Sequence, residues 1–391
     1  MSQMIDHMSQ CLWLSEMNNK GGVTMADLKN LLRDYGNVNQ IKAEKKQVLI
    51  ERFSKKPERT NQLIAFLNNR SVDSQLRHLA EKAIENGIRA VSITDEIYPE
   101  RLRNISSSPL VLYFRGENYV KIFSSAFFAT IIGTRTPTAY GRIVTEQICS
   151  DLARQGVVII SGMARGIDSI AHEAALAADG LTVAVVGNGP DVVYPPENKD
   201  LMAKIADQGV IISEHPPGTM PLKKYFPARN RILSGLSDAV AVIEASTQSG
   251  TMITASFAGD QGKDIYAVPG SILSPFSSGC NQLIREGAEV LTRASDMLWR
   301  LPAGQFQSWL EQTIRQQRDE ELKLPDNHQP SLASQIIHAL TGHAMTLDEI
   351  AGQLDIELQK AAMMVSGLEI DGLIQAERSR YSLTRKALCS I

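Results

Sequence analysis

The sequence predicts an α/β protein whose core is a doubly wound parallel sheet, and three observations support this. Six short runs in the middle of the chain are apolar throughout instead of alternating, which is typical of strands buried on both faces. Helix-like stretches lie between the runs, and two of them, AYGRIVTEQICSDLARQG and GIDSIAHEAALAADG, end at glycine as helices commonly do. Each run also ends in small or polar residues. The six runs are FFATIIGTR, VVIISG, LTVAVVGNG, VIISEH, AVAVIEAS and DIYAVPG.

The composition fits a globular protein with more than one domain. A chain of 391 residues suggests two or three domains, and 43% apolar with 21% charged residues allow a buried core. The four cysteines form no CxxC pair, which argues against a zinc site or a disulfide framework and favours a reducing compartment. We therefore expect no bound metal.

Neither a targeting sequence nor a membrane segment is expected. The first residues, MSQMIDHMSQCLWLSEM, lack the basic and apolar regions of a signal peptide. No apolar run approaches the roughly 18 residues that span a bilayer. We expect a cytoplasmic protein without a membrane partner. Because the formal net charge is only −3, any surface that binds nucleic acid has to be local.

Residues 1–95 have the pattern of short helices. Thr24 and Asp27 resemble a capping box in front of MADLKNLLRDYG, whose leucines form one apolar stripe. Gly36 is suited to end that helix. A second amphipathic run, SQLRHLAEKAIENG, follows. We expect a small helical domain here and the sheet domain at residues 96–300.

The end of the chain predicts a linker and a third domain. Residues 301–330 are polar, rich in glutamine and interrupted by prolines, which indicates a short helix and then a linker. Residues 331–391 show three helical patterns followed by a hairpin-like end. This order suits a winged-helix-like domain.

The loops after the strands should form one ligand-binding edge, because open parallel sheets bind ligands beyond the carboxyl ends of their strands. Glycine and serine in these loops leave backbone N–H groups open to an anion, and the helices that follow add dipolar attraction. Arg135 is the one unambiguous cation among the loop residues. The loops contribute Gly133, Thr134 and Arg135; Ser161 and Gly162; Gly187, Asn188 and Gly189; Ser213 and Glu214; residues 246–251; and Pro269 with Gly270.

The segment KKYFPARNRILSGLSD, residues 223–238, concentrates positive charge at the same edge, because it follows the fourth of these strands. Pro227 suits the first position of a helix, so a helix N-terminus is expected here. Lys223 and Lys224 can neutralise phosphate groups. Phe226 offers an aromatic face to a base, and such stacking contributes about 1–3 kcal/mol per base.

Two interpretations stand for the other residues of this segment. Arg229 lies over the apolar stripe of the predicted helix, whereas Arg231 points elsewhere. We favour a structural role over contact with a nucleotide for Arg229, as a half-buried ion-pair partner, and for Tyr225. Phe226 fits the core and the site equally well.

The sequence shows no evident reaction centre. It has no GxGxxG followed by an acid, no P-loop and no GxSxG nucleophile elbow. His172 falls within a helix, where a packed or hydrogen-bonded histidine is the favoured interpretation over a general base. Asp168 opens the same helix and is better interpreted as a capping carboxylate. The pattern therefore predicts an anion-binding crevice without catalytic residues.

A set of motifs in the middle of the chain resembles a known family. In chain order they are GTRTPTAYG, SGMARGIDSIAH, GNGPDVVYPPEN, SEHPPG, FPARNRILSGLSDAVAVIEA, SGTMITA and AVPGS. They resemble the DNA-processing protein family DprA, also called Smf, over roughly residues 95–295. The flanks match by pattern only, since family members often carry an N-terminal sterile-alpha-motif-like (SAM-like) helical domain and a C-terminal winged-helix-like domain.

The resemblance implies a recombination mediator of natural transformation. Such a protein binds incoming single-stranded DNA, shields it from nucleases and helps to load the RecA recombinase. The resemblance also implies a Rossmann-like core, self-association into a homodimer, no cofactor and no enzymatic activity.

The resemblance also suggests which residues contact DNA. The DNA-binding pocket of the family maps onto Arg135, Lys223 and Phe226, joined by glycines and serines of the neighbouring loops. Gly133-Thr134-Arg135 stands where family members usually have Gly-Ser-Arg, so the hydroxyl is kept, and GNGP replaces the usual glycine-cysteine-glycine-leucine. The expected DNA contacts are Gly133, Thr134, Arg135, Ser161, Gly162, Gly187, Asn188, Gly189, Lys223, Lys224, Phe226 and Arg231.

A nucleotide N-ribosidase is the alternative function. The lysine-decarboxylase-like family has the same type of core and uses a PGGxGTxxE motif after a strand. Here the matching stretch, STQSGTMIT, keeps Gly250 and Thr251 but has Thr254 in the position of the glutamate. The carboxylate that would assist the reaction is therefore missing.

A sequence-specific transcription factor acting through the last domain fits less well. The segment that would enter the DNA groove, LDIELQKAAMMVSGLEIDGLI, carries Glu357, Glu369 and Asp371 against Lys360 alone. An acidic helix suits a phosphate-lined groove poorly.

Overall fold

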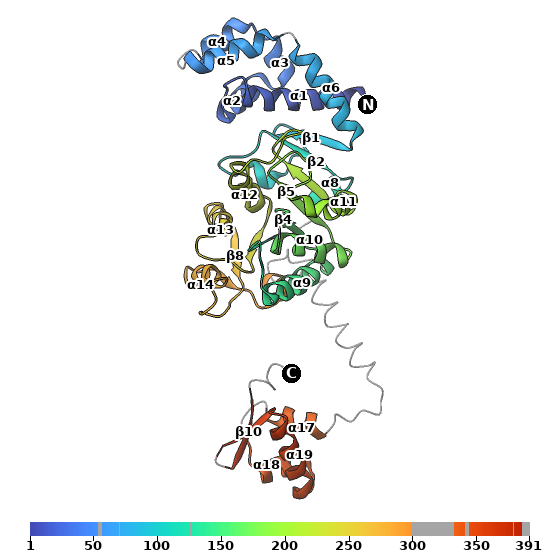
Figure 1. Ribbon diagram of the computed structural model, residues 1–391, viewed down its shortest axis with the longest axis vertical. Coiled ribbons are helices and arrows are strands. Elements are labelled where there is room, and N and C mark those ends of the chain that lie inside the picture. Colours follow the sequence, from blue (N-terminus) through green and yellow to red (C-terminus); the bar gives the residue numbers. More distant parts are fainter. Residues whose placement is uncertain are drawn as a thin grey trace. The chain divides into compact units, whose positions relative to one another are not determined.

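The computed structural model consists of two compact units, Met1–Trp309 and Leu310–Ile391, and each is described by itself (Figure 1). The linker predicted at 301–330 lies outside the described residues. Within the part that the structure describes, no helix is long and apolar enough to cross a membrane. The structure describes residues 1–53, 57–69, 71–124, 127–298, 332–340, 344–377 and 379–384.

A nine-stranded sheet forms the centre of the first unit. Its strand order is β1-β2-β6-β5-β4-β3-β7-β8-β9, and all neighbours from β6 to β9 are parallel. The six predicted strands are confirmed as β3 to β8. The strands are β1 (Ile88–Ser92), β2 (Val111–Arg115), β3 (Phe128–Ile132), β4 (Val158–Ser161), β5 (Thr182–Val186), β6 (Val210–Ser213), β7 (Ala239–Val242), β8 (Asp264–Ala267) and β9 (Glu289–Val290).

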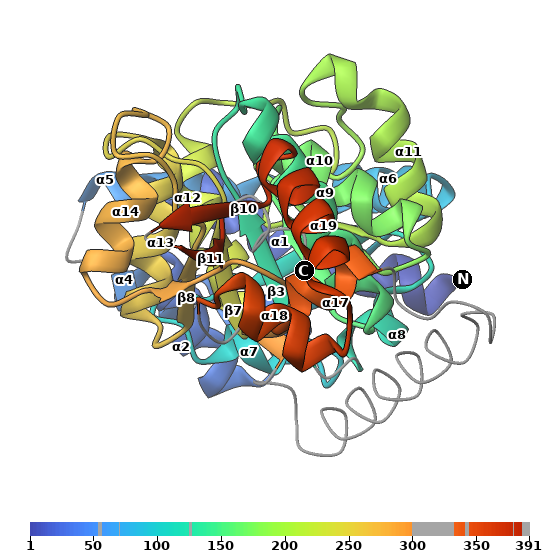
Figure 2. The same cartoon turned by 90° about the horizontal axis from the view of Figure 1, so that it is seen from below.

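Helices cover both faces of this sheet, so the predicted doubly wound core is confirmed. One set packs on the face that carries Ala129 and Ile159, and the other on the face that carries Phe128 and Val240. Figure 2 shows the two sets on opposite sides of β3, β7 and β8. The first set is α9 (Ala139–Arg154), α10 (Ile167–Ala177) and α11 (Lys199–Gln208), and the second is α12 (Tyr225–Leu236), α13 (Gly250–Asp260) and α14 (Ser278–Arg285).

The order of the strands reverses next to β3. The chain runs outward from β3 through β4 and β5 to β6, and it then returns to place β7 on the other side of β3. The loops that follow β3 and β7 therefore diverge at the carboxyl edge. Such a reversal is where open α/β sheets leave a crevice for ligands.

Three further strands extend the sheet beyond the predicted set: β1 and β2 at one end, and β9, which pairs parallel to β8, at the other. β1 and β2 are antiparallel to each other, and β2 is antiparallel to β6. β1 precedes the predicted domain boundary at residue 95, yet it pairs within the sheet.

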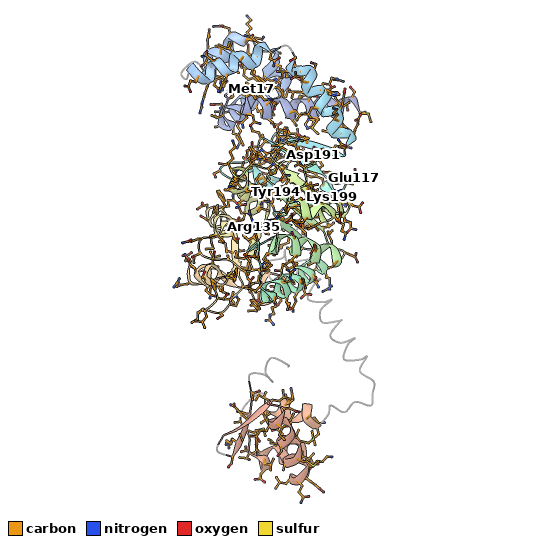
Figure 3. All side chains as sticks on the ribbon, in the orientation of Figure 1. Met17, Glu117, Arg135, Asp191, Tyr194 and Lys199 are labelled. Atoms are coloured by element: carbon orange, nitrogen blue, oxygen red, sulfur yellow. The ribbon has the colours of Figure 1, made fainter. Side chains whose placement is uncertain are left out.

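Short helices precede the sheet, and their leucines pack against β1 and β2. The Thr24 hydroxyl accepts from the Asp27 N–H at 3.2 Å and the Asp27 carboxylate from the Thr24 N–H at 3.3 Å, so the predicted capping box is confirmed. Buried Met17 (Figure 3) belongs to an apolar cluster that continues onto Val111 and Tyr113 of β2. The helices are α1 (Ser2–Asn19), α2 (Met25–Tyr35), α3 (Val38–Ala43), α4 (Lys46–Phe53), α5 (Pro57–Asn68) and α6 (Val72–Glu85).

The second unit contains helices followed by a two-stranded antiparallel sheet. Apolar residues from all three of its described helices and from both strands form one core. The elements are α17 (Leu332–Ala339), α18 (Leu347–Leu354), α19 (Leu358–Ile370), β10 (Ile374–Glu377) and β11 (Arg380–Leu383).

Candidate functional site

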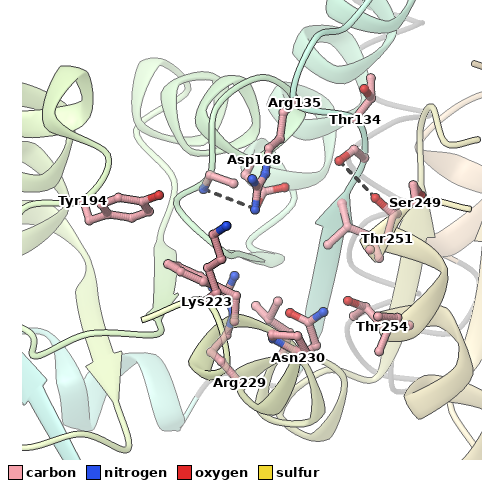
Figure 4. A pocket seen from close by; sticks show the side chains of 18 residues that line it. Thr134, Arg135, Asp168, Tyr194, Lys223, Arg229, Asn230, Ser249, Thr251 and Thr254 are labelled. Atoms are coloured by element: carbon pink, nitrogen blue, oxygen red, sulfur yellow. Dashed lines mark hydrogen bonds between the residues drawn. The ribbon is translucent and has the colours of Figure 1, made fainter. Parts of the chain in front are cut away.

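A crevice of about 620 Å³ opens at the carboxyl edge of the sheet, at the reversal of strand order (Figure 4). The end of β3 forms its floor, and the first turns of α12 and α13 form two of its walls. A smaller hollow of about 40 Å³ adjoins it and shares Arg135, Tyr194 and Phe226. The crevice is therefore built from segments that are far apart in the sequence.

Two exposed cations project into the crevice. Arg135 belongs to the loop after β3, and Lys223 lies just before α12; both line the crevice. Within the described ranges, neither side chain forms an ion pair or a hydrogen bond to a carboxylate. Both charges are thus available to an anion, and their convergence raises the positive potential of a concave surface.

Two aromatic rings lie beside these cations. The ring centroids of Tyr194 and Phe226 are 5.3 Å apart, with 36° between the ring planes. Arg135 and Tyr194 are labelled in Figure 3 as well as in Figure 4. A Cβ atom at Gly187 would meet the Phe226 ring at 3.3 Å, so a residue without a side chain lets this ring lie against the strand end.

Arg229 and Asp168 line the crevice but mainly hold its loops. The Arg229 guanidinium donates to the Gly162 carbonyl at 2.8 Å and to the Val185 carbonyl, and burial lowers its pKa to about 10. The Asp168 carboxylate accepts from the N–H groups of Gly162 at 3.1 Å and Ala164 at 3.3 Å. Burial raises the pKa of Asp168 to about 6, although the charge of Arg229 and these N–H donors act in the opposite direction.

Arg231 does not face the crevice, contrary to its place among the expected DNA contacts. Its side chain is largely buried and lies 2.6 Å from the Glu214 carboxylate, and it also donates to the carbonyls of Ser107 and Ala228. Helix geometry explains the placement, because residues two positions apart, such as Arg229 and Arg231, point to different sides.

The other expected contacts fall into two groups. Those that line the crevice or the adjoining hollow are Gly133, Thr134, Arg135, Gly162, Gly187, Asn188, Lys223 and Phe226. Those outside both linings are Ser161, Gly189, Lys224 and Arg231.

Side-chain contacts within the protein explain why Ser161 and Lys224 lie outside the linings. The buried Ser161 hydroxyl donates to the Ile131 carbonyl at 2.6 Å and so joins two strand ends. Lys224 is exposed and lies over the Tyr225 ring, 5.4 Å from its centroid.

Helix α12 begins at Tyr225, which is two residues before the start that Pro227 predicted.

One wall of the crevice lies at the expected ligand-binding edge but contributed none of the expected DNA contacts. Its residues lie on and before α13, and Tyr194 lies on the opposite side (Figure 4). Their glycine and hydroxyl content gave a signal for the α13 wall, whereas nothing local marked Tyr194. Ser249, Gly250 and Thr251 belong to the stretch 246–251 that the sequence placed at this edge, but they were not among the expected DNA contacts. The lining residues that were not expected at the site at all are Tyr194, Asn230 and Thr254.

Two groups that could support a reaction, His172 and Glu244, are buried, and each makes a hydrogen bond within the protein. His172 is buried, its Nδ1 lies 2.7 Å from the Thr182 hydroxyl, and burial lowers its pKa to about 3, so the packed histidine is confirmed. The buried Glu244 carboxylate accepts from the N–H of Thr138 at 2.9 Å and from its hydroxyl at 2.5 Å. Among the described residues, no group of three or more His, Cys, Asp or Glu side chains could hold a metal ion.

Comparison with known proteins gives a consistent set of similarities. The family model described as DNA recombination-mediator protein A matches residues 89–302. DNA processing protein DprA of Bacillus subtilis (strain 168) is 41% identical over 218 residues, which cover 56% of this chain and 73% of that protein.

Two solved structures extend the similarity to the fold. The X-ray structure of DNA processing protein A from Streptococcus pneumoniae superposes with a TM-score of 0.53 at 33% identity, covering 66% of this chain and 93% of that one. DNA processing protein A from Helicobacter pylori, solved for its single-stranded DNA binding mode, gives a TM-score of 0.50 at 30% identity, covering 57% and 96%.

Proposed function

The chain belongs to the family of DNA recombination-mediator protein A, and on this premise we propose that it is a DNA-processing recombination mediator that binds single-stranded DNA in the crevice. The family resemblance drawn from the sequence motifs is thereby confirmed. The relative from H. pylori is described as binding single-stranded DNA, which supports the same ligand here.

The convergence of two cations and two aromatic rings carries the proposal. Arg135 and Lys223 suit the phosphates of one strand, while the rings of Tyr194 and Phe226 suit unpaired bases. Stacking contributes about 1–3 kcal/mol per base and tolerates any sequence. A duplex offers only its backbone to such a crevice, because its bases are already stacked on one another.

We extend the proposal to the other properties that the family resemblance implies. The protein would help to load the RecA recombinase and would act as a homodimer, in which two crevices engage one strand and raise avidity without new contacts. A cytoplasmic location is consistent with the free, buried thiols of Cys11, Cys149 and Cys280, since reducing compartments keep thiols unpaired.

Charge reversal tests the crevice assignment. Arg135→Glu and Lys223→Glu should each weaken binding of a labelled single strand and reduce the slope of log K against log salt by at least about 0.7, the value for one phosphate contact. Lys204→Glu is the matched control, because this exposed residue of α11 lies outside the crevice and changes the net charge equally.

Binding isotherms at several salt concentrations give the slopes, and circular dichroism checks the fold of each variant. Equal slopes in all three variants and the wild type would show that the strand binds elsewhere.

We also propose that the crevice binds without reacting, because Thr254 occupies the position of the N-ribosidase glutamate. Release of free base from nucleoside monophosphates would refute that part.

A further inference from the structure

The sequence placed the α13 wall at the anion-binding edge, but no DNA contact has so far been assigned to it. Ser249, Gly250 and Thr251 line the crevice at the N-terminus of α13, facing the side that carries Tyr194 (Figure 4). None of the cations or rings assigned above belongs to this wall.

Some hydrogen-bond donors of this wall have no acceptor among the described residues. The first N–H groups of an α-helix have no partner within the helix. In α13 the Met252 N–H donates to the Ser249 carbonyl at 3.1 Å, which leaves the N–H groups of Gly250 and Thr251. Ser249 is the N-cap of α13, but its side chain makes no capping bond, and its buried Oγ has no hydrogen-bond partner. Thr251 differs, because its hydroxyl donates to the Gly133 carbonyl at 3.1 Å and so fixes α13 to the end of β3.

A second, independent group in the crevice also lacks an acceptor. The Arg229 side chain is only 7% exposed and lines the crevice, and its Nε has no hydrogen-bond partner. Asp168, the carboxylate in the lining, already accepts from Gly162 and Ala164. The free groups are thus donors and positive charges, which call for a ligand with several negatively charged acceptor oxygens.

We propose that the N-terminus of α13 is a second phosphate subsite of the crevice, in which Ser249 and the Gly250 N–H bind a phosphate group of the strand. The subsite deepens the proposed function and rests on it. A strand whose bases lie against Tyr194 and Phe226 would extend across the crevice floor and reach α13 with another phosphate. The phosphate is either an internal diester or the terminal monoester of a strand end.

Substitution of Gly250 can remove one donor with little disturbance. Gly250 has no positive φ, and a Cβ atom there would meet nothing within 4 Å. Ser249 has φ −76° and ψ 152°, which is the backbone region that a residue before proline prefers. Proline also suits the first position of a helix, so Gly250→Pro should fold while lacking the N–H. Gly250→Ala keeps the N–H and is the matched control.

The test compares the two variants on one oligothymidine with a 5′-hydroxyl, a 5′-phosphate or a 3′-phosphate. Gly250→Pro should bind about ten-fold more weakly than Gly250→Ala, the effect of one lost hydrogen bond to a charged group. A loss on every oligonucleotide identifies the internal diester, and a loss confined to one phosphorylated end identifies the terminal monoester. Equal binding of the two variants to all three would overturn the subsite.

A second pair of variants guards against a folding defect. Gly250→Asp places a carboxylate at the helix N-terminus, where it stabilises the helix but repels a phosphate, and Gly250→Asn is its neutral isostere. Gly250→Asp should therefore melt no lower than Gly250→Asn yet bind several-fold more weakly. Equal affinity would again overturn the subsite. If the wild type binds no single strand, the proposed function itself fails, which separates the two outcomes.

Discussion

The guanidinium of Arg231 lies 2.6 Å from the carboxylate of Glu214, and their side chains are only 10% and 16% exposed. Arg231 also donates to the Ser107 carbonyl at 2.8 Å. These contacts join α12 to the loop after β6 and to the segment after α7 (Glu100–Arg103). Since the first turn of α12 carries Phe226, the pair holds one wall of the crevice in place without touching a ligand there.

Arg231→Gln should lower the free energy of unfolding by about 3 kcal/mol, because removal of one partner leaves a buried carboxylate without its counter-charge. Urea denaturation measures the change. Arg154→Gln, which removes an exposed pair with Asp151, should change it by less than about 1 kcal/mol. In the folded Arg231→Gln protein, the salt slope of single-strand binding should equal that of the wild type; a smaller slope would make Arg231 a phosphate contact.

Arg231 also shows why the sequence predicted the core better than the site. The strands β3 to β8 were predictable because burial on both faces leaves a local apolar signature. The role of Arg231 depends on Glu214 and Ser107, which are distant in the sequence, so its charge alone suggested a DNA contact. Tyr194 was missed for the converse reason, since only the folded loop brings its ring to Phe226.

The antiparallel strands β1 and β2 were harder to predict than the parallel strands β3 to β8. β1 has a partly exposed centre, including Arg89, because the strand lies at the edge of the sheet. Both pair antiparallel, and such strands do not need the continuous apolar run of a buried parallel strand.

Removal of either ring of the crevice should weaken single-strand binding. Tyr194→Ala and Phe226→Ala should each reduce the affinity by about 1–3 kcal/mol, because each removes a surface on which a base can stack. The salt slope should stay unchanged, since no charge is lost. Fluorescence anisotropy at several salt concentrations measures both quantities.

Tyr194→Phe is the control for this prediction, because it keeps the ring and removes only the hydroxyl. It should bind like the wild type. A loss of affinity as large as that of Tyr194→Ala would mean that the hydroxyl, and not the ring face, contacts the strand.

Gly141 and Glu244 should show strong coupling in stability. A Cβ atom at Gly141 would overlap the buried Glu244 carboxylate, which caps the N-terminus of α9 through Thr138. Gly141→Ala should therefore destabilise the protein by about 1–3 kcal/mol, the usual result of overpacking, although alanine is the better helix former. In a Glu244→Ala background the overlap is gone, and Gly141→Ala should become neutral or stabilising. Urea denaturation of the four proteins measures the cycle, and simple additivity would contradict the predicted contact.

The stability of the protein should depend on pH through Asp168. Burial raises the pKa of its carboxyl to about 6, above the roughly 3.9 of an unfolded chain. The native state therefore binds more protons than the unfolded state between these values. The stabilisation from the protonated form is complete below about pH 4 and is lost as the pH rises through 6. Asp168→Asn carries no such titration and mimics the neutral form.

Relative to the wild type, Asp168→Asn should gain up to about 3 kcal/mol of stability between pH 4 and pH 7, since each pKa unit corresponds to about 1.4 kcal/mol. Urea denaturation of both proteins at four pH values measures the difference. His172, whose pKa burial lowers to about 3, gives a slope of the opposite sign, because the unfolded state then binds more protons below pH 6.5. That contribution is common to both proteins and cancels in the difference. A difference that stays constant with pH would mean that Asp168 remains ionised throughout, stabilised by the charge of Arg229 and by its N–H donors.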